Sequence, residues 1–350
     1  MIKKVLISIL GIISLAAVLK LFNYAVEHQS GTNEQSIDST KSFSAFSIDI
    51  PKKVDFAGER VPLEIIDVYE RLDRELLVNT YWQSQTLLFH KRAYKYFPLI
   101  EPILKKNGVP DDFKYLALVE SGFTNLVSPM GATGFWQLME GTAKDKGLEI
   151  NDEVDERYHI EKSTDAACKY LLEAYKALKS WTLVAASYNM GIGGIQNQME
   201  RQKAENYYDL LLNEETSRYV FRALAVKLII TNPQKYGYYI SAKNLYKPIT
   251  TFTIAVDSSI ADLANFASSQ NINYKILKIF NPWLRQNYLT NIDHKKYIIT
   301  LPKNFVNEDY LLDHGYNYDE GENSEKDSTA ITKDTSASGN LINKDSVVKN

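Results

Sequence analysis

Apolar residues recur three and four positions apart over most of the first 230 residues, which is the spacing of one face of an α-helix. A proline at position 62 suits the start of the first such run, and the pair Asn232-Pro233 suits the end of the last. The pattern therefore predicts a mainly helical region, with helices over residues 63–76, 87–107, 140–146, 161–178, 182–188 and 216–230.

One further predicted helix, residues 111–121, is apolar on every face and ends in a glutamate. Asp111 or Asp112 is expected to cap its first turn, and Gly122 supplies a left-handed stop. A carboxylate on such a buried helix is costly unless it is paired, solvated in a cleft or kept neutral. Glu120 is therefore either a structural carboxylate at a helix end or a group with a chemical task.

The pattern changes after residue 249. Residues 251–256 alternate between polar and apolar as a strand does, and residues 297–301 form a second such run before Pro302. Two short helical runs, 259–267 and 274–280, lie between them. The order is β-α-α-β, which predicts a small module at 249–302.

The two ends of the chain differ from its middle. Residues 1–26 place two lysines before a long apolar run, which predicts a secretion signal oriented with its positive end inside. The run is long enough to span a bilayer, which favours a retained membrane anchor over a cleaved signal and a secreted protein. Residues 27–55 are expected to form a linker, and the polar residues 320–350 a disordered tail. The body of the protein is then expected in the periplasm or cell envelope.

Composition narrows the choice of partner. The 350-residue chain is 45% hydrophobic and 24% charged, as a folded globular protein is, and its formal net charge of −3 gives no electrostatic reason to expect nucleic acid. The single cysteine, Cys168, lies in a helical pattern and is expected to be a small buried residue.

Three sequence blocks then carry a specific resemblance. Residues 120–123 have the pattern E-S-x-F, residues 131–139 have G-x-x-G-x-W-Q-x-M, and residues 186–191 have A-x-Y-N-x-G. In this order the blocks resemble the catalytic domain of the lytic transglycosylases that cut bacterial peptidoglycan, and the membrane-bound type D group in particular. The resemblance covers residues 56–240 and implies a lysozyme-like fold of helices packed around a cleft.

The module at 249–302 is similar to a LysM glycan-binding module. The usual Gly-Asp after the first strand is replaced by Asp257-Ser258. Whether this module binds glycan or only packs on the main domain is left open, because fold analogy alone does not decide function.

The resemblance implies a mechanism for Glu120. As general acid it protonates the bond between N-acetylmuramic acid and N-acetylglucosamine, and as base it then takes the proton of the C6 hydroxyl, closing a 1,6-anhydro ring. Burial raises the pKa of such a carboxyl and suits it to be the acid. No metal and no organic cofactor is implied. The partners are peptidoglycan glycan strands and the membrane, with substrate-binding residues Ser128, Gln137, Met139, Tyr188, Asn189 and Tyr219.

Several of these residues also have purely structural interpretations. Tyr219 could be a core tyrosine with a satisfied hydroxyl, and Trp136 is expected to be a core wall. Ser121 is expected to orient the loop because no histidine lies nearby to activate it. Glu140 suits the N-terminus of its own helix.

Two rival functions remain. A hydrolytic muramidase needs a second acid to activate water, for which Asp152 or Asp155 is available, although the acidic run 152–156 is most simply solvated. A non-catalytic wall-binding protein would use the anchor, linker and module equally well, but it has no need for Glu120.

Overall fold

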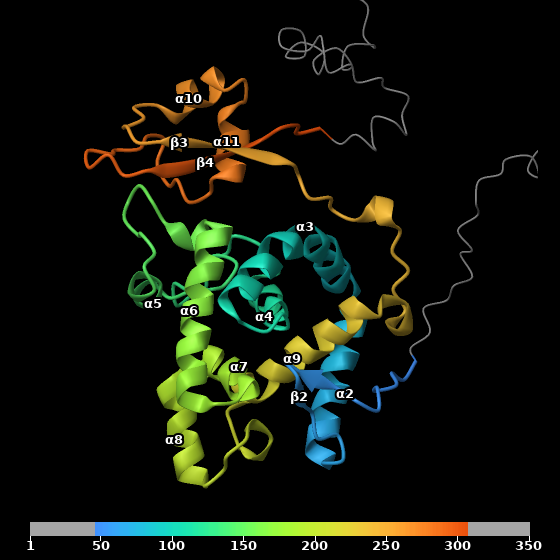
Figure 1. The fold of residues 1–350 in the computed structure, drawn as a ribbon. Coiled ribbons are helices and arrows are strands. Elements are labelled where there is room, and N and C mark those ends of the chain that lie inside the picture. Colours follow the sequence, from blue (N-terminus) through green and yellow to red (C-terminus); the bar gives the residue numbers. More distant parts are fainter. Residues whose placement is uncertain (1–45, 307–350) are drawn as a thin grey trace, which may run out of the picture. The chain divides into compact units, whose positions relative to one another are not determined.

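The computed structural model describes residues 46–306 (Figure 1). The chain divides into two units, Met1–Ser47 and Ile48–Asn350, and every element below belongs to the second. The predicted anchor at 1–26 and tail at 320–350 lie outside the described residues. Between residues 46 and 306, no helix is both long enough and apolar enough to cross a membrane.

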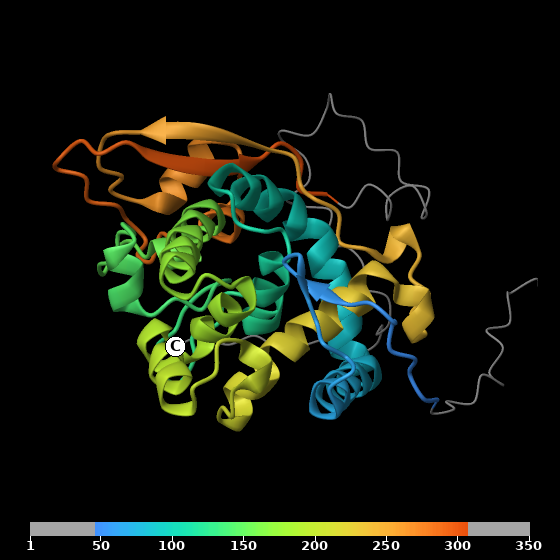
Figure 2. The same ribbon diagram turned by 60° about the horizontal axis from the view of Figure 1, so that its bottom comes forward.

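The first part of this unit is helical, as the periodicity predicts. A short hairpin of β1 and β2 precedes the helices, and 3₁₀ turns join several of them (Figures 1 and 2). The elements are β1 (Asp55–Phe56), β2 (Glu59–Arg60), α2 (Ile66–Tyr81), α3 (Gln83–Asn107), α4 (Phe113–Ser121), α5 (Glu140–Asp145), α6 (Ile160–Leu178), α7 (Trp181–Met190), α8 (Ile192–Gln202) and α9 (Glu214–Thr231), with 3₁₀ turns at Glu156–Tyr158, Tyr207–Asp209, Pro233–Tyr236 and Ala242–Asn244.

Helix α4 lies within the core and packs against α3 and α9 (Figure 1). Every residue of α4 except Glu120 is buried, which is why the sequence is apolar on all its faces. Gly122 ends the helix with φ 58°, in the left-handed region that favours glycine. The fold therefore leaves one side chain of this helix, a carboxylate, at the boundary with solvent.

The predicted cap of α4 is wrong. Asp112 precedes the helix with helical backbone angles, φ −58° and ψ −21°, and its side chain makes no capping hydrogen bond. The Asp112 carboxylate instead accepts from the backbone N–H of Ala57 at 2.6 Å and from Lys227 Nζ at 2.7 Å. Asp111 pairs with Lys114. Partners more than fifty residues away outcompete the local cap, and sequence spacing does not reveal them.

A carboxylate near the start of the described chain caps a distant helix. Glu59 in β2 accepts from the backbone N–H groups of Trp181 and Thr182 at 2.6 and 2.9 Å, and from the Thr182 hydroxyl at 2.6 Å. Ser180 also donates to it at 2.8 Å. These bonds satisfy free N–H groups at the positive end of α7. The hairpin thereby fixes the helix that carries the A-x-Y-N-x-G block.

Helix α8 is not anticipated by the sequence pattern, because Gly193 and Gly194 fall in its first turn. A Cβ on Gly194 would lie 2.7 Å from Met190 Cγ, so any larger residue there would force the Met190 side chain to shift. Gly191, with φ 85°, separates α7 from α8.

Residues 251–302 form the β-α-α-β module that the alternation predicts. Strand β3 (Thr251–Val256) pairs antiparallel with β4 (Tyr297–Pro302), with Thr253 opposite Thr300. Helix α10 (Leu263–Ser269) begins four residues later than predicted because Asp262 caps it, and α11 (Tyr274–Phe280) begins where predicted. The fold class, mainly helical with a small two-stranded module, is confirmed.

The module docks on the acidic connection between α5 and α6. The backbone N–H of Asp155 donates to Trp283 O at 2.9 Å, and that of Arg285 donates to Glu153 O at 2.7 Å. Asp155 and Glu156 are buried, 8% and 3% exposed. The expectation that this run is solvated is therefore wrong for these two residues, whose carboxylates are neutralised by Arg157 and Lys162.

Candidate active site

Glu120 stands at the centre of the candidate site. Its Oε1 accepts a hydrogen bond from the hydroxyl of Tyr219 in α9. Burial raises the pKa of the Glu120 carboxyl, and the nearby Glu215 carboxylate raises this pKa further. The Tyr219 hydrogen bond and the Arg222 guanidinium act in the opposite direction and lower it. The net effect is a carboxyl whose pKa lies above its ordinary value. Such a group can hold a proton and give it up.

Two arginines bind the backbone around this carboxyl. Arg222 Nη2 of α9 donates to Val119 O at 2.6 Å, and Arg92 Nη1 of α3 donates to Gly122 O at 3.0 Å. The last carbonyls of a helix lack intrahelical partners and carry partial negative charge, so both cations stabilise the end of α4. They fix the backbone on each side of Glu120.

Two tyrosines line the same region. Tyr219 is 5% exposed, and Tyr188 of α7 donates its hydroxyl to Trp136 O at 2.7 Å. Burial, reinforced by the charge of Glu120, raises the pKa of both phenols well above 10. Both therefore remain hydrogen-bond donors throughout the physiological pH range.

The loop after α4 carries three of the predicted substrate-binding residues. Gln137, at φ 46°, donates through Nε2 to Gly134 O at 2.8 Å and to Leu126 O at 3.1 Å, so its amide holds the loop together. The Ser128 hydroxyl accepts from the N–H of Ala132 at 3.0 Å. Met139 is 45% exposed and is free to contact a ligand. Between residues 46 and 306, the hydrogen bonds of Glu120 include none to these three residues.

The loop is held against the rest of the domain by close packing. Gly134 has φ 79°, and a Cβ there would lie 2.1 Å from Arg157 O. The Ser121 hydroxyl donates to Phe135 O at 2.9 Å, which agrees with an orienting role and not a nucleophilic one. Trp136 is fully buried and donates to Thr164 Oγ1 at 2.8 Å, as expected of a core wall.

Asn189 leads to a residue that the sequence reasoning missed. Its amide donates to Glu215 Oε1 at 2.9 Å and accepts from the Thr216 hydroxyl at 2.7 Å. Glu215 is exposed and near enough to Glu120 to raise its pKa. Glu215 and Tyr219 are four residues apart and share a face of α9, a spacing that could have pointed to Glu215 once Tyr219 was placed in the cleft.

The structure thus brings Glu120, Tyr188, Tyr219, Asn189 and Glu215 into one region. Of the two acids considered for activating water, Asp155 forms an ion pair with Arg157 at 2.8 Å. Asp152 has an exposed side chain, and its backbone carbonyl accepts from Gln286. Over residues 46–306, no group of three or more His, Cys, Asp or Glu side chains is arranged to hold a metal ion.

Comparison with known families matches two ranges of the chain. Residues 98–211 match the transglycosylase SLT domain, and residues 252–305 match the soluble lytic transglycosylase C-terminal LysM-like domain. Over 235 residues the chain is 28% identical to membrane-bound lytic murein transglycosylase D of Escherichia coli (strain K12), which covers 65% of this chain and 50% of that protein. The chain therefore spans about half the length of the curated relatives that it matches.

Two solved structures are also similar. The lytic transglycosylase Slt of Pseudomonas aeruginosa, an inactive mutant, is 20% identical with a TM-score of 0.34, covering 43% of this chain and 26% of that one. The 70 kDa soluble lytic transglycosylase of Escherichia coli is 17% identical with a TM-score of 0.36, covering 58% of this chain and 41% of that one.

Proposed function

We propose that the chain is a peptidoglycan lytic transglycosylase, because residues 98–211 match the transglycosylase SLT domain and residues 252–305 match the soluble lytic transglycosylase C-terminal LysM-like domain. Its substrate is the glycan strand, cut between N-acetylmuramic acid and N-acetylglucosamine. The observation that carries the proposal is the partly buried Glu120 carboxyl, with a raised pKa and a hydrogen bond from Tyr219.

Glu120 acts first as the acid. Its Oε1 is engaged by Tyr219, and within the described residues Oε2 has no protein hydrogen-bond partner. Oε2 is thus the oxygen that presents a proton to the glycosidic oxygen. When that proton leaves, the Tyr219 hydroxyl and the Arg222 guanidinium both stabilise the carboxylate that remains.

The same carboxylate then acts as base. It accepts the proton of the C6 hydroxyl, whose oxygen closes on the anomeric carbon and forms the 1,6-anhydro ring, so water is not consumed. Tyr188 and Asn189 are proposed to contact the sugar from α7, and Ser128, Gln137 and Met139 from the loop at 126–139. The exposed thioether of Met139 supports such a contact.

A hydrolytic muramidase is the second candidate, and the observation in its favour is Glu215. This carboxylate is the acid whose charge raises the pKa of Glu120, and Asn189 orients it. An acid placed across the cleft could activate water. Asp155 loses its support as the alternative acid, because its carboxylate is buried in an ion pair with Arg157.

The mass of the released muropeptides separates the two reactions. Purified protein is incubated with isolated sacculi, and a 1,6-anhydro product is one water lighter than a hydrolysed product. Glu120→Gln is expected to lower release at least about a thousandfold, because general acid and base assistance are lost together. Retained release by that variant, or products of hydrolysed mass, would contradict the proposal.

Anchoring in the cell envelope is also proposed. The two lysines before the apolar run at 1–26 and the name of the membrane-bound relative from Escherichia coli support it. If residues 1–26 remain attached as an anchor, the protein stays in the membrane pellet after alkaline carbonate extraction. Removal of residues 2–26 should release it to the supernatant.

A further inference from the structure

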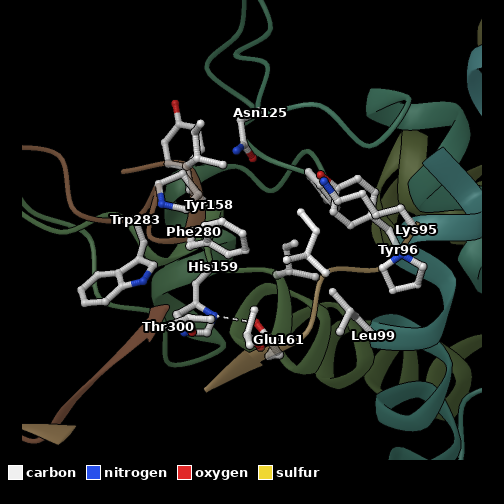
Figure 3. Close-up of a pocket in the computed structure, with 17 residues that line it drawn as sticks. Lys95, Tyr96, Leu99, Asn125, Tyr158, His159, Glu161, Phe280, Trp283 and Thr300 are labelled. Atoms are coloured by element: carbon white, nitrogen blue, oxygen red, sulfur yellow. Dashed lines mark ion pairs between the residues drawn. The ribbon is translucent and has the colours of Figure 1, made fainter. Parts of the chain in front are cut away.

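A cavity of about 140 Å³ lies between the helical domain and the β-α-α-β module (Figure 3). Side chains of α3 line one side of it, including Lys95, Tyr96 and Leu99, and Phe280 and Trp283 of the module line the opposite side. Its volume is about ten times the space that one ordered water needs. The cavity is therefore large enough for part of a small organic ligand.

One cation that lines this cavity, Lys95, has no ion-pair partner among the described residues. Glu161 pairs with His159, Oε2 to Nδ1 at 3.1 Å, and this contact lowers the pKa of the Glu161 carboxyl. Lys95 forms neither a hydrogen bond nor an ion pair with any described residue, and its Nζ lies 5.2 Å from the centre of the Tyr96 ring. Burial lowers the pKa of its ammonium, as expected of a cation that lacks an anion. Lys95 therefore lines the cavity without an ion-pair partner among the described residues, while the Glu161 carboxylate is engaged by His159.

Neutral polar groups around the cavity are also without protein partners. Asn125 and Thr251, which are exposed, and Thr300, which is half-buried, line it, and their side chains make no hydrogen bond to any residue between 46 and 306. Polar side chains that face a cavity are ordinarily satisfied by water or by a ligand. Together with Lys95 they offer donors and acceptors suited to a carboxylate and a neighbouring amide.

The aromatic walls are occupied by protein contacts. Trp283 is 3% exposed and stacks with His159 and Tyr297, with ring centroids 5.9 and 5.7 Å apart. Arg285 lies over the Tyr158 ring at 4.2 Å. Neither ring is a free platform for stacking a sugar. The walls therefore provide an apolar lining suited to short aliphatic groups.

We propose that this cavity binds a free carboxylate of the peptide stem that peptidoglycan carries on its muramic acid, with Lys95 as the counter-ion. The proposal rests on the proposed function for its choice of substrate. Asn125, which lines the cavity, lies in the segment directly after α4, five residues beyond Glu120 in the sequence. A stem bound there would be recognised by both the helical domain and the module.

The test is isothermal titration calorimetry of the full chain with N-acetylmuramyl-L-alanyl-D-isoglutamine, whose carboxylate is free. The matched ligands are its methyl ester, which lacks the charge, and tri-N-acetylchitotriose, which lacks the peptide. The matched proteins are Lys95→Met and Lys105→Met, because Lys105 lies on the same helix, is exposed and does not line the cavity. Loss of a charge-assisted hydrogen bond is expected to weaken binding about tenfold.

The proposal requires that the free acid binds wild type and Lys105→Met equally, and that Lys95→Met and the methyl ester each weaken binding about tenfold. It is overturned if Lys95→Met binds the acid as wild type does, if the ester binds as well as the acid, or if chitotriose binds with the same dependence on Lys95. Binding is measured here without turnover, so its outcome is separate from that of the muropeptide mass measurement, which tests the cleavage chemistry.

Discussion

The hydroxyl of Tyr219 donates a hydrogen bond to Oε1 of Glu120, joining α9 to α4 across 99 residues of sequence. Tyr219 is buried and Glu120 is half-buried, so the pair lies at the edge of the core. The bond gives the carboxylate a donor in surroundings that otherwise disfavour its charge. It therefore sets how readily Glu120 releases its proton and takes one back.

Tyr219→Phe is expected to shift the pH profile of cleavage. The Tyr219 hydrogen bond lowers the pKa of Glu120, so its removal raises that pKa further. The first step needs protonated Glu120, and the alkaline limb of kcat/KM should therefore move to higher pH. The rate should fall about tenfold or more, because a hydrogen bond to a charged group is lost. The measurement is muropeptide release from sacculi between pH 4 and pH 9.

Tyr170→Phe is the matched control for that experiment. Tyr170, like Tyr219, is a tyrosine that donates its hydroxyl in a hydrogen bond. Its acceptor is the backbone oxygen of Ser187 at 3.0 Å, next to Tyr188, and not Glu120. The alkaline limb of the pH profile of Tyr170→Phe should therefore coincide with that of the wild type. An equal shift in both variants would mean that the limb reports the packing of the region and not the Tyr219 bond.

Glu120→Gln is expected to stabilise the protein at neutral and higher pH. Burial raises the folded-state pKa of Glu120, so the folded chain holds its proton more tightly than the unfolded chain. The contribution of Glu120 to stability is thus fully present below the unfolded pKa and is lost as pH rises through the folded pKa. The variant should melt roughly 2 °C or more above wild type at pH 8, and the difference should vanish near pH 3.

Glu140→Gln is expected to have no stabilising effect at pH 8, unlike Glu120→Gln. Glu140 is exposed, and its hydrogen bond with Lys144 lowers its pKa. Its contribution to stability is present above the unfolded pKa and is lost as pH falls through the folded pKa. Calorimetric scans at the two pH values should show no stabilisation by this variant at pH 8. Equal stabilisation by both variants would point to net charge as the cause.

Gly134→Ala is expected to destabilise the fold and reduce activity. A methyl group there would lie 2.1 Å from Arg157 O, at φ 79°, so the loop would have to move away from the 3₁₀ turn Glu156–Tyr158. The cost should be at least about 2 kcal/mol in urea unfolding. Gly131→Ala has a similar φ of 83° with nothing within 4 Å, and it should cost about 1 kcal/mol. A smaller loss at position 134 than at position 131 would contradict the packing described here.

Glu59→Gln is expected to weaken the cap of α7. The Glu59 carboxylate accepts from two backbone N–H groups and two hydroxyls at the start of that helix. Removing its charge should lower the free energy of unfolding by about 2 kcal/mol with an unchanged m-value. Glu64→Gln removes an exposed partner of Arg60 and should cost well under 1 kcal/mol. Urea titrations of both variants compare the two carboxylates directly.

Much of the site could be predicted because its parts are local patterns. The apolar faces around Glu120 mark a buried helix, and the glycines at 131 and 134 mark tight turns. The alternation at 251–256 and 297–301 places the two strands of the module. In each case the relevant physics acts within one turn of helix or one strand, so the sequence carries it.

The structure decided what depends on contacts between distant segments. Asp112 binds Ala57 and Lys227 and does not cap its own helix. Glu156 is neutralised by Lys162 beneath the docked module and is not solvated. Local spacing cannot show which of several possible partners a carboxylate takes, because the choice depends on which helices fold against each other.

The sequence by itself determined that a carboxylate ends a buried helix, and that glycine-rich turns and a small β-α-α-β module follow it. Only the tertiary structure decided which donor reaches that carboxylate, which acid lies near it, and which lysine is left without a counter-ion. The physical reason is that helical periodicity fixes which face of an element is buried, whereas the proton affinity of a buried group is set by charges and donors brought to it by packing.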